Sequence, residues 1–438
     1  MATDELTAVS LFVRLLQFET VSDTGPTNGG YKSCAEWLCS QCTEAGLTSF
    51  VLPESVENKP IVVAEWKGID DSLPCVFLNG HYDVVPVVES QWQYPAFAGY
   101  RENGRIYGRG SQDMKCVCIQ YLIALKRLKQ RGYIPTRTIR LSFVPDEEIG
   151  GIDGMGVLLN SSWFLERPIG IALDEGLASE SDEYSVFYGE RLPWWIRITA
   201  EGNTGHASRF IEGTAMEQMM GVANRALEFR RKQKELLHGS CPHSGCSHSV
   251  AQSKTLGDVT SLNITKLHTN SDGSAEAFNV VPSTVQAGMD IRISPHVDPG
   301  DMALEIDRWC KEAEEAVPGG KGIKWEFDVN RGQQHATTAT DESNPWWEVF
   351  TRCLSEQCGV QCKPMVFPAA TDSRFLRALG IKAFGFSPIR RSPILLHEHN
   401  EYLAEDVFLE GCEVYCHVIT ALSSQAELQE DTCTNTSK

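Results

Sequence analysis

The sequence predicts an α/β protein in which a larger α/β domain carries an inserted, smaller α+β domain. Three observations predict this architecture. Helical and strand patterns alternate through residues 1–190. A different order of elements follows in residues 191–331, and the alternation of helices and strands returns in residues 332–438. Alternating strands and helices favour a sheet with helices packed on its faces. The 438-residue chain is long enough for two domains with separate cores.

Residues 1–190 show the helical and the strand periodicity in turn. Residues 4–17 and 31–45 have helical spacing of apolar positions, and so does DMKCVCIQYLIALKRLKQRG, which ends at Gly132. Short apolar runs rich in β-branched residues predict the strands IVVAEW, CVFLNGHYDVV, TIRLSFV and IGIALDEG. We therefore expect a sheet with helices on both faces.

Residues 191–331 show a different order of elements. The pattern predicts a strand, a helix, two strands, a helix and a strand, at 193–200, 213–237, 258–267, 284–293, 300–316 and 323–329. This β-α-β-β-α-β order is the ferredoxin-like pattern, and its length suits one small domain. The larger domain then continues with a predicted helix over 344–358. The polar tail from about residue 424 is expected to fray.

Composition excludes several classes of partner and location. The formal net charge of −19 argues against nucleic acid or an anionic membrane surface as partner. No apolar run is long enough to span a bilayer, and the acidic amino end has no secretory signal pattern. Fifteen cysteines, an odd number, fit free thiols in a reducing compartment. We therefore expect a cytoplasmic protein.

Acids and histidines recur where predicted strands end or a glycine-rich loop enters a helix. They come from five separate segments: His81 and Asp83, Asp113, Glu147 with Glu148, Glu175, and His397. Open α/β sheets bind ligands outside the carboxyl ends of their strands. Imidazole and carboxylate donors without cysteine suit two Zn²⁺ or similar divalent ions bridged by a carboxylate. The residues alone do not choose between His397 and His399.

Spacing adds detail to two of these segments. His81 and Asp83 are two residues apart and share a face of their strand, so Asp83 is expected to accept the second imidazole N–H. Pro145 ends the next strand, which lets the adjacent Glu147 and Glu148 serve one site. Asp146 is expected to be an exposed turn residue.

The five motifs carry a resemblance to a known family. GHYDVVP, GRGSQDMK, VPDEEIGG, ALDEG and LLHEHNE, in this order, resemble the zinc-dependent exopeptidases and deacylases, which include aminoacylases, glutamate-type carboxypeptidases and dipeptidases. The resemblance to the aminoacylase branch extends to segments outside these motifs, such as YGERLPWWIRIT, FNVVPST and PAATDSRFLRALG.

The resemblance implies a metal site and an activity. One zinc ion would be held by His81, Asp113 and Glu175, and a second by Asp113, Glu148 and His397, with Asp113 bridging. His397 is preferred over His399 because Asn400 and Glu401 complete the family pattern H-x-x-N-E from it. Glu147 would be the general base for a metal-bridged water. The implied reaction is hydrolysis of N-acyl-L-amino acids to a carboxylate and a free amino acid.

The resemblance also implies roles for residues of the inserted lid and dimerisation domain. His206, in GHASRF, would reach the active site of the partner subunit in a homodimer and stabilise the oxyanion. Asn279 and Arg292 would help to bind the substrate. Arg374 would bind the substrate α-carboxylate, with a buried structural ion pair as the alternative.

Two other functions and one other site remain as alternatives. The first is a dipeptidase or carboxypeptidase-like enzyme with the same metal core. The second is a non-catalytic binding homologue, which the intact ligand positions, Asp83 and Glu147 disfavour. The segment SCPHSGCSH contains Cys241, His243, Cys246 and His248, which would form a third metal site or belong to an insertion.

Overall fold

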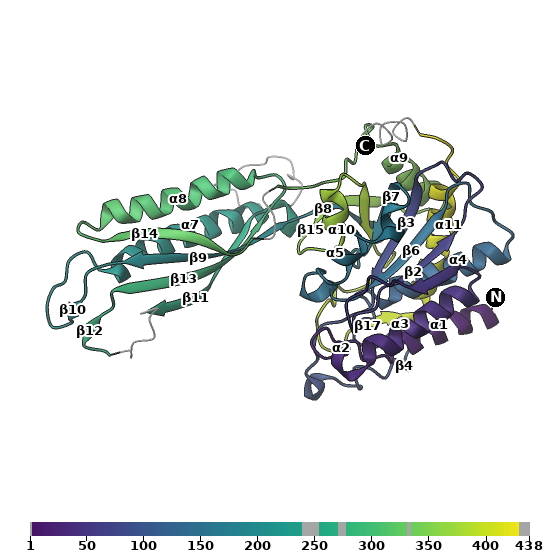
Figure 1. The fold of residues 1–438 in the computed structure, drawn as a ribbon, viewed down its shortest axis with the longest axis horizontal. Helices are drawn as coiled ribbons and strands as arrows, with labels where there is room; N and C mark the ends of the chain where they lie inside the picture. The colour runs from purple at the N-terminus through teal and green to yellow at the C-terminus, as the bar shows by residue number, and fades with distance from the viewer. Residues whose placement is uncertain (1, 239–253, 270–276, 331–333, 429–438) are drawn as a thin grey trace, which may run out of the picture. The chain divides into compact units, whose positions relative to one another are not determined.

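The computed structural model describes residues 2–238, 254–269, 277–330 and 334–428 (Figure 1). It divides into two compact units. Unit 1 consists of Met1–Tyr188, Thr338–Met365 and Thr371–Lys438, and unit 2 of Gly189–Thr337 and Val366–Ala370. The insertion predicted from the sequence spanned residues 191–331. The Cys241–His248 segment and the last ten residues of the predicted tail lie outside the described residues.

Unit 1 is built on an eight-stranded mixed sheet. Its strands, in spatial order, are β1 (Thr48–Val51), β2 (Val62–Trp66), β6 (Ile139–Val144), β3 (Cys75–His81), β7 (Ile169–Asp174), β16 (Ala383–Phe386), β8 (Tyr184–Glu190) and β15 (Cys362–Phe367). The four central strands β6, β3, β7 and β16 run parallel, so their carboxyl ends meet at one edge. β2 and β8 pair antiparallel on either side of them.

Helices cover both faces of this sheet, as predicted. Every residue of β3 and β6 is buried, as expected for parallel strands covered on two sides. Val76 and Leu78 of β3 belong to one apolar cluster, whereas Cys75 and Phe77 belong to a second one. The helices of unit 1 are α1 (Ala2–Leu16), α2 (Gly25–Asn28), α3 (Gly30–Glu44), α4 (Lys115–Gln130), α5 (Met155–Leu158), α6 (Ser162–Leu165), α9 (Pro345–Arg352), α10 (Ser373–Ala378) and α11 (Glu405–Ser423).

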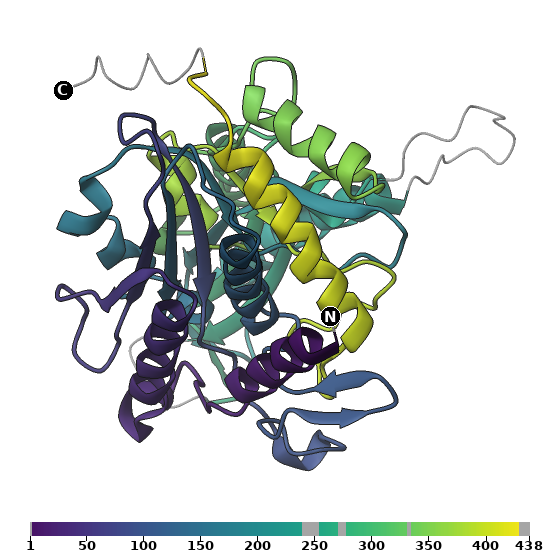
Figure 2. The same ribbon diagram turned by 90° about the vertical axis from the view of Figure 1, so that its right-hand side faces the viewer.

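Four further details of unit 1 concern the site and the predicted elements. α4 and α11 pack side by side (Figure 2), with the rings of Tyr121 and Tyr415 4.6 Å apart. A small sheet of β17 (Tyr402–Ala404), β5 (Arg105–Tyr107) and β4 (Tyr100–Glu102) joins the segment after His397 to the segment before Asp113. The helix predicted over 344–358 is α9 followed by a π-helical turn, Cys353–Gln357. Short 3-10 turns lie at Glu89–Gln91 and Glu147–Ile149.

Unit 2 has the predicted ferredoxin-like order. Its four-stranded antiparallel sheet consists of β11 (Ser261–Thr269), β13 (Thr284–Ile293), β9 (Leu192–Glu201) and β14 (Gly322–Asn330). Helices α7 (Ala215–His238) and α8 (Pro299–Ala316) cover one face (Figure 1), and strict burial alternation along β13 leaves polar residues on the other. A 3-10 turn at Leu256–Asp258 precedes β11, and the two-residue strands β10 (Gly205–His206) and β12 (Val280–Val281) pair beyond the main sheet.

The lengths and apolar character of the helices can be compared with what a membrane span requires. Among the described residues, none of the helices combines the length and apolarity that crossing a bilayer requires.

Candidate metal centre

Two groups of imidazole and carboxylate side chains assemble at the carboxyl edge of the central strands. His81 ends β3, Glu175 follows β7, Glu148 follows β6, and Asp113 precedes α4. Within the described part of the chain, the structure brings together His81, Asp113 and Glu175, and separately Asp113, Glu148 and His397. In each group the ligand atoms lie within 4.8 Å of one another. All five positions expected to bind metal are therefore adjacent, and His399 is in neither group.

Asp113 belongs to both groups and presents one oxygen to each. Its Oδ1 lies 3.1 Å from Nε2 of His81, and its Oδ2 lies 3.2 Å from Nε2 of His397. Glu175 lies 3.5 Å from the first imidazole nitrogen, and Glu148 lies 3.1 Å from the second. This is the geometry that a bridging carboxylate requires.

The hydrogen bonds around His81 fix its tautomer. Its Nδ1 lies 3.0 Å from the backbone carbonyl oxygen of Asp83. A carbonyl only accepts, so Nδ1 carries a hydrogen, and in the neutral ring the Nε2 lone pair faces Asp113 and Glu175. The Asp83 carboxylate, expected to accept this hydrogen, is more distant at 3.4 Å.

Asp83 has a second role that its spacing from His81 did not indicate. Its fully buried carboxylate accepts the backbone N–H groups of Glu147 and Glu148, each at 3.2 Å. Asp83 therefore holds the turn that carries the two adjacent glutamates, and orients the first imidazole chiefly through its backbone.

The pKa values of the site residues indicate an excess of buried negative charge that bound cations would neutralise. Burial raises the pKa of Glu175 and Glu147 well above the usual range, and it raises that of Glu148 to about 7. Hydrogen bonds with Asp113 and Glu148 raise the pKa of His397 to about 10. Burial alone would lower the pKa of His81, but the carboxylates of Glu175, Asp113 and Asp83 raise it well above its usual value.

Burial therefore disfavours the ionised forms of Glu147, Glu148 and Glu175. For Asp113, hydrogen bonds with His397 and His81 outweigh burial and lower the pKa. Unpaired buried carboxylates are costly, and divalent cations would remove that cost. Two imidazoles and three carboxylates also form the N/O donor set that Zn²⁺ and related ions accept. The residues present therefore fit a dinuclear metal centre.

Glu147 lies beside the two groups without belonging to either. It is 9% exposed, and its Oε1 lies 3.7 Å from Nη1 of Arg374. Arg374 donates to the backbone carbonyls of Thr371 and Gly150, both at 2.8 Å. The guanidinium therefore ties the turn after Glu148 to α10 and lies close to the proposed base.

Asp146 is not the exposed turn residue that the sequence suggested. It is 2% exposed, accepts a hydrogen bond from Tyr31 Oη at 3.0 Å, and forms an ion pair with Lys59. Its φ of +64° is a left-handed conformation that Asp adopts more readily than most residues. The bend at Asp146 begins the turn in which Glu147 and Glu148 both face the site.

Sequence reasoning missed a buried ion pair that joins two parts of the site. Glu401 is fully buried and accepts the N–H groups of Gly110 and Gln112 at 3.1 and 2.6 Å. It also accepts from Nη1 of Arg109 at 2.8 Å. Arg109 in turn donates to the backbone carbonyl of His397 at 3.2 Å. The pair therefore connects the loop before Asp113 to the turn that carries His397.

The predicted residues of unit 2 fall in two places. His206 ends β10 and Asn279 directly precedes β12, and the Ala207 N–H donates to the Asn279 carbonyl at 2.9 Å. Both side chains are exposed. Nδ1 of His206 accepts the N–H of Ser208 at 3.2 Å, so in the neutral ring the hydrogen is on Nε2.

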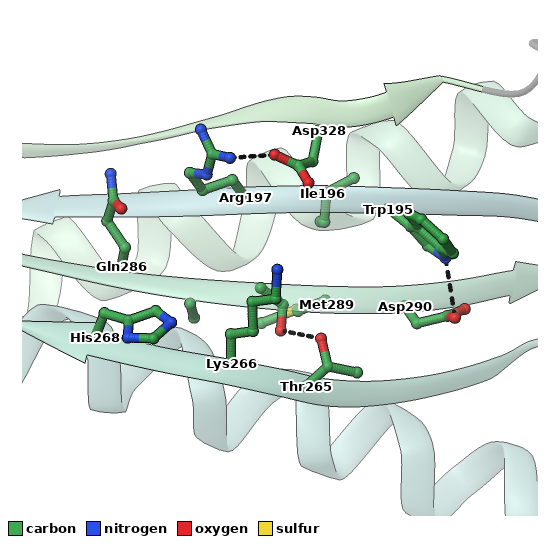
Figure 3. Close-up of a pocket in the computed structure, with 12 residues that line it drawn as sticks. Trp195, Ile196, Arg197, Thr265, Lys266, His268, Gln286, Met289, Asp290 and Asp328 are labelled. Carbon is green, nitrogen blue, oxygen red and sulfur yellow. Dashed lines mark hydrogen bonds and ion pairs between the residues drawn. The ribbon is translucent and has the colours of Figure 1, made fainter. Parts of the chain in front are cut away.

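Arg292 lies on the polar face of the unit 2 sheet. It donates to both carboxylate oxygens of Asp290, at 2.7 and 3.0 Å. Asp290 also accepts from Nε1 of Trp195 at 3.0 Å, at one end of a cavity of about 510 Å³ (Figure 3). On the neighbouring strand pair, Arg197 is similarly paired with Asp328 (Figure 3). The expected substrate-binding arginine is thus engaged by an acid two residues away.

Comparison with known families shows which family the chain belongs to. The model of peptidase family M20/M25/M40 matches residues 77–421. The chain belongs to this family. The resemblance inferred from the five motifs is therefore confirmed.

Individual M20 relatives are similar over nearly the whole chain. Aminoacylase-1 from Mus musculus is 42% identical over 418 residues, which cover 95% of each chain. Aminoacylase-1 from Homo sapiens is 39% identical over 432 residues, which cover 98% of each. The Bacillus subtilis YXEP protein, described as a dinuclear metal binding peptidase, superposes with a TM-score of 0.66 at 13% identity, covering 97% of this chain and 100% of its own. That structure shares the fold.

Proposed function

We propose that this M20 protein is a metal-dependent amidohydrolase that cleaves N-acyl-L-amino acids into a carboxylate and a free L-amino acid. The observation that carries the proposal is the placement of the two Asp113 oxygens between two imidazole–carboxylate groups, with Glu147 beside them. The substrate class is supported by the sequence identity of 42% and 39% to two aminoacylase-1 proteins over nearly the whole chain.

The metal assignment follows the two groups. His81, Asp113 and Glu175 would hold one Zn²⁺, and Asp113, Glu148 and His397 a second. When bound, such ions supply Lewis acidity to the amide carbonyl and to water. The orientation of His81, fixed by the Asp83 carbonyl so that Nε2 faces Asp113 and Glu175, supports the first assignment.

Glu147 is the general base in this proposal. It takes the proton of the attacking water and returns it to the departing amine, so the same carboxylate serves both steps. Its burial raises the pKa of the carboxyl, which makes it a stronger base than an exposed glutamate. Arg374 lies close enough to favour the ionised form needed for the first step.

The oxyanion and the rest of the substrate are assigned to further residues. His206 would donate its Nε2–H to the oxyanion, consistent with the hydrogen bond that fixes its tautomer. Asn279 and Arg292 would assist substrate binding, and Arg374 would bind the α-carboxylate. Arg374 already donates to two backbone carbonyls. Binding the α-carboxylate therefore requires a further guanidinium N–H that is accessible to the substrate.

We further propose a cytoplasmic homodimer in which His206 of one subunit completes the site of the other. The exposure of His206 and Asn279 supports a role completed by another molecule. The location is supported by the cysteines, since those in the described residues are free thiols.

Side-by-side steady-state hydrolysis tests the proposed substrate class. Zinc-loaded protein is given N-acetyl-L-methionine and an unblocked methionine dipeptide at equal concentrations. We expect a higher kcat/KM for the acetylated substrate. Preference for the dipeptide would keep the metal chemistry and assign the enzyme to the dipeptidases, and no turnover of either would refute the proposal.

A further inference from the structure

The segments next to the β10–β12 pair carry the most exposed aromatic side chains among the described residues of unit 2. Phe210 is 102% exposed and Phe278 is 111% exposed. Phe278 directly precedes Asn279, and Phe210 follows His206 through a turn in which the Arg209 N–H donates to the His206 carbonyl at 3.1 Å. We refer to residues 204–211 and 277–281 as the tip.

Neither phenylalanine contributes to the core of unit 2. The apolar cluster of this unit is formed by the main sheet with α7 and α8, and it contains neither ring. The tip is held by its own backbone pairing and by the Thr204 hydroxyl, which donates to the Val281 carbonyl at 2.6 Å. Two fully exposed phenylalanines that the fold does not use indicate a surface that covers an apolar group of another molecule.

The adjacent polar groups indicate which group that is. In the proposed function, His206 donates to the oxyanion of the scissile amide, and the present inference rests on that assignment. The oxyanion and the acyl chain are bonded to the same carbonyl carbon, whereas the amino-acid side chain is two bonds further along. Apolar rings on the segments that carry His206 and Asn279 are therefore placed to meet the acyl chain.

We propose that Phe210 and Phe278 form the contact surface for the acyl chain, and that the enzyme acts on N-acyl amino acids with apolar acyl chains longer than acetyl. The polar neighbours orient the amide, and the two rings cover the methylene groups of the acyl chain. Hydrophobic contacts of this kind distinguish substrates by chain length.

The test uses full-length zinc-loaded protein and N-acetyl-, N-butanoyl- and N-hexanoyl-L-methionine. We expect kcat/KM of the unsubstituted protein to rise by about tenfold or more from acetyl to hexanoyl, since one methylene in a hydrophobic pocket is worth at least that much. Phe210→Ala and Phe278→Ala should each flatten this rise, and Phe210→Leu should restore part of it. Leu304→Ala is the matched control, because Leu304 is an apolar side chain on α8 that is 67% exposed.

Three results would overturn the proposal. One is an unchanged acyl-length profile in both alanine variants. Another is an equal loss for all three substrates, which would assign the rings to docking of the tip rather than to acyl recognition. The third is an unsubstituted protein that hydrolyses none of the three substrates, which would overturn the proposed function as well. An active protein whose variants keep their profile would overturn only this inference.

Discussion

The metal centre of unit 1 and the tip of unit 2 hold their functional groups in opposite ways. At the metal centre, His81, Asp113 and Glu175 are buried, and Nε2 of His81 lies 3.1 and 3.5 Å from the two carboxylates. At the tip, His206 and Asn279 are exposed, and Nε2 of His206 is directed away from the contacts that fix its ring. In the proposed function, folding and metal would complete the first site, whereas a second molecule would complete the tip.

The largest effect is expected at Glu147. Glu147→Ala removes the base without removing a metal ligand, so we expect kcat to fall by at least about 10²–10⁴. Metal content, measured by elemental analysis after dialysis, should stay at two ions per chain. Glu148→Ala is the comparison, since it should lose both activity and metal. A Glu147→Ala variant with full activity would remove Glu147 as the base.

A smaller loss is expected at His206. His206→Asn removes the Nε2–H donor, and loss of one oxyanion donor typically costs about 10²–10³ in kcat. Metal content should not change, because the residue belongs to unit 2. His268→Asn is the control, as His268 is another exposed histidine of the same unit. Equal rates for the two variants would assign His206 to an ordinary loop position.

The Arg109–Glu401 pair should affect metal affinity more than chemistry. Glu401→Gln removes the charge that pairs with Arg109 and weakens the loop that presents Asp113. Loss of such a supporting residue typically weakens metal binding by about 10–100-fold, which competition with a chelator measures. Glu405→Gln provides the control, since its partner Arg101 is 44% exposed. Unchanged affinity in Glu401→Gln would show that the loop is held by other contacts.

The effect expected at Asp146 concerns stability rather than metal binding or catalysis. Asp146→Asn keeps a residue that tolerates the positive φ but loses the ionic contact with Lys59. Hydrogen bonds to charged groups contribute about 1.5–3 kcal/mol, so the free energy of unfolding in urea should fall by that amount. Asp146→Ala should cost more, because alanine also disfavours the left-handed backbone. Equal stability of all three proteins would mean that Asp146 is not needed to form the turn.

The sequence predicted most of unit 1 because its functional residues follow the ends of strongly patterned strands. His81, Glu148 and Glu175 each lie at or just beyond a buried strand, and parallel strands end at one edge. The choice of His397 over His399 came from the family pattern, since both lie in one irregular segment without periodicity.

Other features could not be predicted because they depend on contacts between distant segments. Arg109 and Glu401 are 292 residues apart in the sequence, and neither has a local pattern that indicates its partner. Asp146 was assigned to the surface because its neighbours form a polar turn, but Tyr31 and Lys59 reach it from other elements. At Arg292 the sequence suggested substrate binding, and the structure adds the bidentate contact to Asp290.

Subunit complementation tests most directly whether the buried metal centre and the exposed tip act together. His206→Asn and Glu147→Ala proteins are each zinc-loaded, mixed under conditions that allow subunits to exchange, and assayed on N-acetyl-L-methionine. We expect the mixture to gain activity that neither variant shows alone, because one site of each mixed dimer has an intact base and an intact tip histidine. A mixture that stays at the sum of the two residual activities, although mixed dimers form, would contradict it.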